Sequence, residues 1–171
     1  MVNSLHDQNT KTHYLFPGTI FVHKEQHLVT TVLGSCVAVC IWHPKAEVGG
    51  INHYLLPLWN GEGLPTPKYG NVAISRLIDK VRNLAGSGDL VAKVFGGASM
   101  WSRAEGALAV GERNVELALR SLEEEKIKIV SQDVYGEMGR KVIFDTKTGN
   151  VLLRRNPNVA MRARMEKGND R

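Results

Sequence analysis

Short apolar segments, each ended by proline, glycine or polar residues, are the feature that most restricts how this chain can fold. Segments this short are typical of β-strands. The expected strands are 14–22, 28–32, 36–42, 48–56, 90–95, 127–130, 141–144 and 151–153. Only residues 71–85 and 112–125 place their apolar side chains on one face of a helix. Many strands with two helices predict an α+β domain.

Proline and glycine also mark the connections between these segments. Pro44 and Pro57 end two neighbouring strands, which are expected to pair as a hairpin through residues 44–47. Residues 57–70 contain three prolines and three glycines and are expected to form a loop. The first helix follows this loop, and Asn71 is a candidate for its N-cap.

The chain of 171 residues is expected to hold one domain, because it has neither an internal repeat nor a linker. The expected division is a flexible leader at 1–13, the domain at 14–155 and a basic, flexible tail at 156–171. Much of the net charge of +5 lies in the last eighteen residues. A basic tail can bind nucleic acid, but no aromatic side chain is interleaved with its arginines. Nucleic acid is therefore not expected as a partner.

The compartment follows from the apolar segments and the cysteines. No segment approaches the roughly 18–20 apolar residues that cross a membrane, and the N-terminal residues lack the apolar part of a secretory signal. Cys36 and Cys40 would lie about 13 Å apart on one extended strand, at about 3.3 Å per residue. A disulfide requires Cα atoms within about 7 Å. An intramolecular disulfide is therefore not expected, which fits a reducing compartment. The protein is expected to be cytoplasmic.

Cys36 directly follows a Gly34-Ser35 turn, and His53 lies in the next strand-like segment. A thiol on a tight turn and an imidazole on a neighbouring strand are the minimum parts of a cysteine nucleophile. The histidine can accept the thiol proton and later give a proton to a leaving amine or ammonia. His43 is nearer in sequence but belongs to the hairpin tip, so His53 is the better partner.

A third group usually orients the histidine of such a pair. Glu47 at the hairpin tip is the only carboxylate near either motif, and the other hydrogen-bonding candidates are Thr30, Thr31, Ser35 and Asn52. A hydroxyl stabilises an imidazolium less than a carboxylate does, so a slow enzyme is expected. The backbone N–H groups of the turn at 34–36 are candidates for an oxyanion hole.

Other interpretations of these residues stay open. An isolated cysteine on an apolar strand is most often a core residue. Zinc is a weaker alternative, because four ligands spread along one hairpin do not converge readily; they would be Cys36, Cys40, His43 and His53. Residues 95–98, Phe-Gly-Gly-Ala, lack the lysine and spacing of a phosphate loop. Their glycines are expected to let the backbone approach another segment closely.

Two blocks around the cysteine and the histidine, TTVLGSCVAV at 30–39 and GGINHYLLP at 49–57, resemble the chemoreceptor glutamine deamidases, the CheD family of bacterial chemotaxis. The similarity extends over about residues 15–155 and includes AKVFGGA at 92–98, GERNV at 111–115, Asp133 and GRKV at 139–142. It departs from the family at Asp133-Val134-Tyr135-Gly136, where a Gly-Gly pair is expected after the aspartate. This departure bears on the shape of the loop and not on the nucleophile.

The resemblance implies a role for three residues. The catalytic cysteine of the family falls on Cys36 and its histidine on His53. Its third residue, a threonine six positions before the cysteine, falls on Thr30, with Thr31 as the adjacent alternative. The implied fold has mixed β-sheets packed together with flanking helices, similar to bacterial toxin-type cysteine deamidases.

The implied reaction is hydrolysis of glutamine side chains to glutamate on the cytoplasmic domains of methyl-accepting chemoreceptors. It would proceed through a thioester on Cys36 and would require no cofactor and no metal. Some members of the family also bind a chemotaxis phosphatase, which is therefore a second candidate partner. A non-catalytic adaptor that binds the receptor or this phosphatase is the alternative function.

Overall fold

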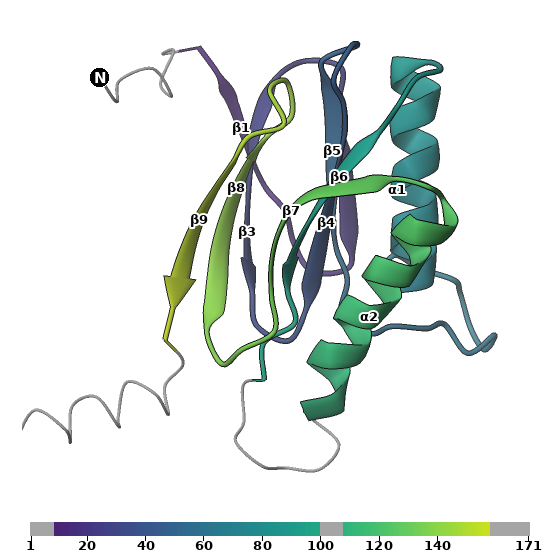
Figure 1. Cartoon of the computed structure of the whole chain (residues 1–171), viewed down its shortest axis with the longest axis vertical. Coiled ribbons are helices and arrows are strands. Elements are labelled where there is room, and N and C mark those ends of the chain that lie inside the picture. Colours follow the sequence, from purple (N-terminus) through teal and green to yellow (C-terminus); the bar gives the residue numbers. More distant parts are fainter. Residues whose placement is uncertain (1–8, 100–107, 158–171) are drawn as a thin grey trace, which may run out of the picture.

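The computed structural model describes residues 9–99 and 108–157, which form two β-sheets packed face to face with two helices on one side (Figure 1). The predicted α+β class, with mixed sheets and flanking helices, is confirmed. Most of the expected leader and tail lies outside the described residues. The exception at the N-terminal side is a strand that begins at Lys11, inside the segment expected to be a leader.

The outer sheet has four strands in the order β1-β3-β8-β9. They are β1 (Lys11–Tyr14), β3 (His27–Leu33), β8 (Gly139–Asp145) and β9 (Val151–Asn156). The central sheet has five strands in the order β2-β5-β4-β6-β7. They are β2 (Thr19–Val22), β5 (Val48–His53), β4 (Val37–His43), β6 (Val91–Gly96) and β7 (Lys128–Val134). Each sheet contains one parallel pair, β1 with β3 and β6 with β7, and is otherwise antiparallel.

The segment 14–22, expected to be one strand, is divided between the two sheets. Pro17 cannot donate a backbone hydrogen bond and Gly18 has a positive φ of 76°, so the chain turns between β1 and β2. The Gly18 N–H donates to the carbonyl of His53 at 2.7 Å. This turn therefore packs against the end of β5, where the candidate histidine lies.

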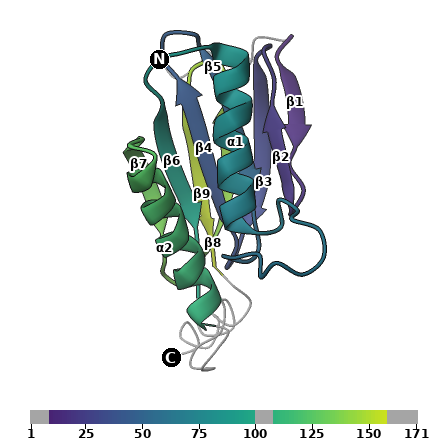
Figure 2. The same ribbon diagram turned by 90° about the vertical axis from the view of Figure 1, so that its right-hand side faces the viewer.

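Both helices, α1 (Gly70–Ala85) and α2 (Leu108–Glu124), lie on the face of the central sheet that points away from the outer sheet (Figure 2). The expectation of an N-cap at Asn71 is wrong, because Tyr69 occupies the cap position without a side-chain bond. The Asn71 Oδ1 instead accepts the Trp59 N–H at 3.0 Å, which holds the preceding loop. Within the described ranges, neither helix is long and apolar enough to cross a membrane.

Strand β4 separates two cores and is buried on both faces. Its Val37, Val39 and Ile41 side chains join the helix-side core, between the central sheet and the helices. Its Ala38 and Cys40 side chains join the intersheet core, between the two sheets. A strand covered on both faces reads as a continuous apolar run, which is why residues 36–42 carry so few polar side chains.

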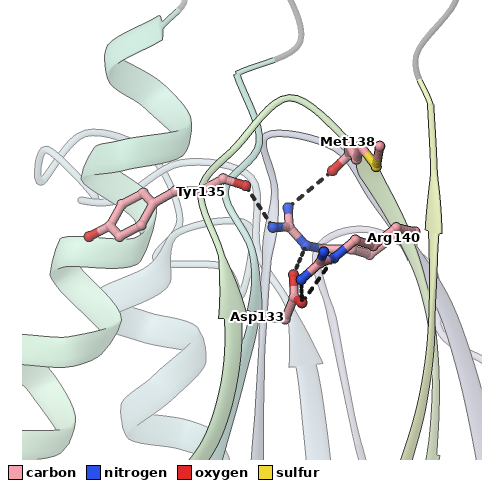
Figure 3. A network of polar contacts seen from close by, with 5 residues as sticks. Asp133, Tyr135, Met138 and Arg140 are labelled. Atoms are coloured by element: carbon pink, nitrogen blue, oxygen red, sulfur yellow. Dashed lines mark hydrogen bonds and ion pairs between the residues drawn. The ribbon is translucent and has the colours of Figure 1, made fainter. Parts of the chain in front are cut away.

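An ion-pair network links the two sheets (Figure 3). Asp133 on β7 accepts hydrogen bonds from Arg140 Nε on β8, at 2.7 Å, and from Arg155 Nε on β9, at 3.1 Å. Arg140 is only 4% exposed, and its remaining nitrogens donate to the carbonyls of Tyr135 and Met138. Because Arg140 pairs with Leu33 across the outer sheet, this network adjoins the turn that carries Cys36.

Candidate active site

The Cys36 turn, residues 33–36, leads the chain from β3 in the outer sheet to β4 in the central sheet. Three of its carbonyls are held from outside the turn. Gly34 O accepts the Ala98 N–H at 2.9 Å, Cys36 O accepts the Gly97 N–H at 2.9 Å, and Ser35 O accepts Asn114 Nδ2 at 3.1 Å. In a trans peptide the N–H points opposite to the carbonyl. The N–H groups of Ser35 and Cys36 therefore point away from these contacts.

Gly96 allows the end of β6 to approach the Cys36 turn this closely, and Gly97 allows the next residue to approach α2. A Cβ atom on Gly96 would lie 2.2 Å from Cys36 O, and one on Gly97 would lie 2.2 Å from Val115 Cγ2. Both glycines also have positive φ angles, 110° and 70°. The expected role of this Gly-Gly pair, close approach of two backbones, is confirmed.

His53 ends β5 and is almost fully buried, with 2% of its surface exposed. Its Nδ1 lies 2.7 Å from the hydroxyl of Thr31, on β3 of the outer sheet. The same hydroxyl donates to the carbonyl of Leu15 at 2.9 Å. The imidazole is thus held between the two sheets by a hydroxyl that is itself anchored to the backbone.

This pair of contacts determines where the proton of the imidazole lies. A hydroxyl has one hydrogen, and the Thr31 hydroxyl donates it to Leu15 O, so it can only accept from His53 Nδ1. Nδ1 therefore carries the proton, and Nε2 keeps a free lone pair. Nε2 is buried and has no hydrogen-bond partner among the described residues. The geometry leaves this nitrogen available as a base.

Cys36 and His53 share one face of the central sheet. Val37 and Tyr54 form an antiparallel bridge, with N–H to O distances of 3.2 and 3.0 Å. Cys36 precedes Val37 and His53 precedes Tyr54, so the two side chains lie diagonally across this pair on its intersheet face. Cys36 accordingly packs against the intersheet core, and His53 reaches Thr31 in the outer sheet. Diagonal neighbours are about 7–8 Å apart at Cα, within reach of long side chains.

Burial keeps both candidate groups neutral in the resting site. It raises the pKa of the half-buried Cys36 thiol above its ordinary value, against a smaller opposing effect of a backbone hydrogen bond. It lowers the pKa of His53 to about 4. A neutral thiol next to a neutral imidazole favours proton transfer during attack over a permanent thiolate–imidazolium pair.

The structure brings Thr31, and not Thr30, to His53. Successive residues of a strand point to opposite faces, so Thr30 lies on the outer face of β3, in register with Ile143. Asn52 is buried on the other face of β5, where its Oδ1 accepts the Val39 N–H at 2.8 Å. Of the four hydrogen-bonding candidates in the sequence, Thr31 is the one whose side chain bonds the imidazole.

The four residues weighed as zinc ligands do not converge on one point among the described residues. Cys40 is enclosed in the intersheet core, where burial raises the pKa of its thiol. His43 lies at the hairpin tip, where its ring nitrogens contact the Ala46 N–H and the Ser87 carbonyl. In the part of the chain that the structure describes, no three His, Cys, Asp or Glu side chains form a group that could hold a metal.

Two contacts of the site were not predicted from the sequence. The Leu15 carbonyl, which fixes the Thr31 hydroxyl, is a backbone group and has no sequence signal. The Asn114 side chain, which holds Ser35 O, lies 79 residues away in sequence. Its block at 111–115 belongs to the family resemblance, but no role followed from that.

Comparison with known proteins gives a consistent result. A family model described as CheD chemotactic sensory transduction matches residues 55–155. The chain is 52% identical over 146 residues to a probable chemoreceptor glutamine deamidase CheD of Trichlorobacter lovleyi, which covers 85% of this chain and 91% of the relative. A probable chemoreceptor glutamine deamidase CheD of Sulfurimonas denitrificans is 46% identical over 82% of this chain and 92% of the relative. A probable chemoreceptor glutamine deamidase CheD 1 of Anaeromyxobacter dehalogenans is 47% identical over 82% of each chain.

Proposed function

The chain belongs to the CheD family, as its motifs predicted, and on this premise we propose that it is a chemoreceptor glutamine deamidase with Cys36 as nucleophile. It hydrolyses the side-chain amide of specific glutamines on methyl-accepting chemoreceptors to a carboxylate. The match of the family model begins at residue 55, after both Cys36 and His53. The proposed roles of these two residues therefore rest on the geometry of the site and on the resemblance of the blocks around them.

In the first half of the reaction, His53 Nε2 accepts the thiol proton as Cys36 Sγ attacks the amide carbon. The carbonyl oxygen becomes an oxyanion, for which the N–H groups of Ser35 and Cys36 are the candidate donors. The imidazolium then gives the proton to the amide nitrogen, the C–N bond breaks, and ammonia leaves. The product of this half is a thioester on Cys36.

In the second half, water replaces ammonia at the same position. His53 Nε2 accepts a proton from water as the oxygen attacks the thioester carbon. Collapse of this intermediate breaks the C–S bond, and the proton returns to Cys36 Sγ. The released side chain is glutamate, and Thr31 keeps Nδ1 protonated through both halves.

The observation that carries this proposal is the free Nε2 of His53 on the same sheet face as Cys36. It supports a general base, because Thr31 accepts the Nδ1 proton and burial keeps the ring neutral at physiological pH. A threonine stabilises the imidazolium intermediate less than an aspartate would. A slow enzyme remains the expectation.

The partners follow from the reaction. The cytoplasmic domain of the receptor is the substrate, so we place the protein in the cytoplasm. A chemotaxis phosphatase is a second partner, proposed from the family resemblance alone. Co-purification of the two proteins, with the receptor fragment as competitor, tests it.

The experiment is mass spectrometry of a receptor cytoplasmic fragment after incubation with the wild type, Cys36→Ala, His53→Ala and Cys40→Ala. Cys40→Ala is the matched control, because it removes the other thiol, which lies in the intersheet core. We expect glutamine-to-glutamate conversion with the wild type and Cys40→Ala only. Conversion by Cys36→Ala would overturn the proposal, and binding without conversion by the wild type would establish the adaptor instead.

A further inference from the structure

Asn114, on α2, is fully buried and joins the Cys36 turn to the end of β5. Its Nδ2 donates to Ser35 O at 3.1 Å and to Leu55 O at 2.9 Å. Ser35 directly precedes Cys36, and Leu55 lies two residues after His53. One side chain from a helix is thus bonded to both segments that carry the candidate pair.

The two carbonyls meet Asn114 where pairing between β4 and β5 is coming to an end. Regular pairing runs from His43 and Val48 to Cys40 and Ile51, and beyond it the segments are joined by the Val39 N–H to Asn52 Oδ1 bond and the Val37–Tyr54 bridge. Ser35 O and Leu55 O are both acceptors, so they cannot bond one another. A donor between them is required to hold the segments together past the bridge.

Only a side-chain amide meets this requirement at the size of asparagine. Its NH₂ group carries two hydrogens, one for each carbonyl, whereas an ionised aspartate has none and a leucine has no polar hydrogen. The backbone of Asn114 is also fixed, because the Tyr54 hydroxyl donates to its carbonyl. Tyr54 directly follows His53, so helix α2 is anchored on the same short segment by two independent bonds.

We infer that Asn114 is a positioning residue, which sets the distance between Cys36 and His53 by bonding the two backbones beside them. This inference rests on the proposed function, since it assumes that the two side chains work as a pair. Without the amide, the Cys36 turn keeps its bonds to Gly97 and Ala98 and lies beside the Val37–Tyr54 bridge, but Ser35 loses its link to Leu55. The thiol would then be separated from its base without loss of the fold.

Alkylation of Cys36 by iodoacetamide tests this without the receptor. The rate of alkylation is measured at neutral pH and at the alkaline plateau, where the thiol is already deprotonated and needs no base. The ratio of the first rate to the second reports the assistance of His53, because a change in the accessibility of Cys36 affects both rates equally. We expect Asn114→Ala to lower this ratio about tenfold, toward the value for His53→Ala. In the double variant, Asn114→Ala should cause no further loss, because its effect acts through His53.

Leu119→Ala is the matched control, because Leu119 lies on the same helix and packs against the helix-side core. It should lower the melting temperature and leave the ratio unchanged.

If Asn114→Ala does not fold, Asn114→Ser takes its place in the experiment. The serine keeps one hydrogen-bond donor, so we expect a ratio between those of the wild type and His53→Ala. A wild-type ratio in a folded Asn114 variant, or losses that add to those of His53→Ala, would overturn the inference. A wild-type ratio in His53→Ala would instead overturn the Cys36–His53 pair of the proposed function, and this inference with it.

Discussion

At the scale of single residues, two adjacent threonines on β3 give the sharpest test of the site. Thr31→Val keeps the shape of the side chain and removes the hydroxyl that holds His53 Nδ1. A buried hydrogen bond left unmade costs about 1–3 kcal/mol, and about 1.4 kcal/mol corresponds to a tenfold rate. We expect the rate of glutamine conversion to fall roughly 10- to 100-fold, measured by mass spectrometry on the receptor fragment.

Thr30→Val is the control for this substitution. The residue lies one position away on the same strand, but its side chain is on the outer face of the sheet. We expect nearly unchanged conversion for Thr30→Val and recovery of activity for Thr31→Ser, which restores the hydroxyl. A large loss for Thr30→Val with no loss for Thr31→Val would return the role to Thr30, where the family resemblance places it.

The buried imidazole of His53 also makes the stability of the protein depend on pH. Burial lowers the pKa of His53 to about 4, whereas an unfolded histidine titrates near 6.5. Between these values the unfolded chain binds the proton and the folded chain does not, so the free energy of unfolding falls as pH falls. The loss from this group amounts to about 3 kcal/mol when the pH has reached 4.

Denaturant unfolding of the wild type and His53→Gln at neutral pH and near pH 4 measures this contribution. The variant cannot take up the proton, so it should lose less stability than the wild type over this interval. Equal losses in the two proteins would mean that His53 is not desolvated in the folded state.

At the scale of elements, the residue after β6, which contacts both the Cys36 turn and α2, can be tested with two glycines of nearly equal φ. Gly97 and Gly63 have φ angles of 70° and 69°. A Cβ atom on Gly97 would meet Val115 and the Gly111 carbonyl, whereas none of the described atoms lies within 4 Å of a Cβ on Gly63. In both variants, the left-handed backbone conformation of the alanine lowers stability by about 1–2 kcal/mol. Gly97→Ala also overpacks its surroundings, which lowers stability by about 1–3 kcal/mol more.

Gly97→Ala should therefore unfold at a lower temperature than Gly63→Ala and lose more activity, because the Gly97 N–H holds Cys36 O. Thermal unfolding and glutamine conversion of the two variants provide the comparison. If both variants are destabilised equally, the close approach of residue 97 to α2 has no energetic importance.

The elements themselves were largely predictable, because their signals are local. The helical periodicities at 71–85 and 112–125 identified both helices, and the apolar runs identified most strands. The division of 14–22 between two sheets was missed, since a single apolar segment carries no sign of which sheet each half joins. The loop after Asp133 departs from the family pattern in sequence, because a Gly-Gly pair was expected there. Tyr135 nevertheless adopts a φ of 64°, a backbone conformation that glycine adopts most easily.

At the scale of the whole molecule, the site depends on pairings that no local pattern contains. Cys36 directly precedes β4 and His53 ends β5, so the two could be paired from the hairpin alone. Thr31 belongs to the outer sheet, and only the packing of one sheet on the other decides whether residue 30 or 31 faces the histidine. The role of Asn114 likewise depends on how α2 packs, so the local motifs predict a nucleophile and a base but not the groups that would support them.

The packing of the two sheets should depend on Asp133, which bonds Arg140 and Arg155 across the layers. Burial opposes the charge of Asp133, but hydrogen bonds from Arg155 and Arg140 outweigh it and hold its pKa below the usual value. Asp133→Asn leaves the nearly buried Arg140 guanidinium without its anion, which costs about 3 kcal/mol.

The exposed Arg155 provides the matched control for this ion pair. Arg155→Gln removes a cation from the same carboxylate, but solvent reaches this side chain, so its effect on stability should be a small part of the Asp133→Asn effect. Because Arg140 pairs with Leu33 at the start of the Cys36 turn, Asp133→Asn should also slow glutamine conversion. Denaturant unfolding and conversion assays measure both effects. Similar losses in the two variants would show that the buried ion pair of Asp133 with Arg140 stabilises the protein no more than the exposed pair with Arg155.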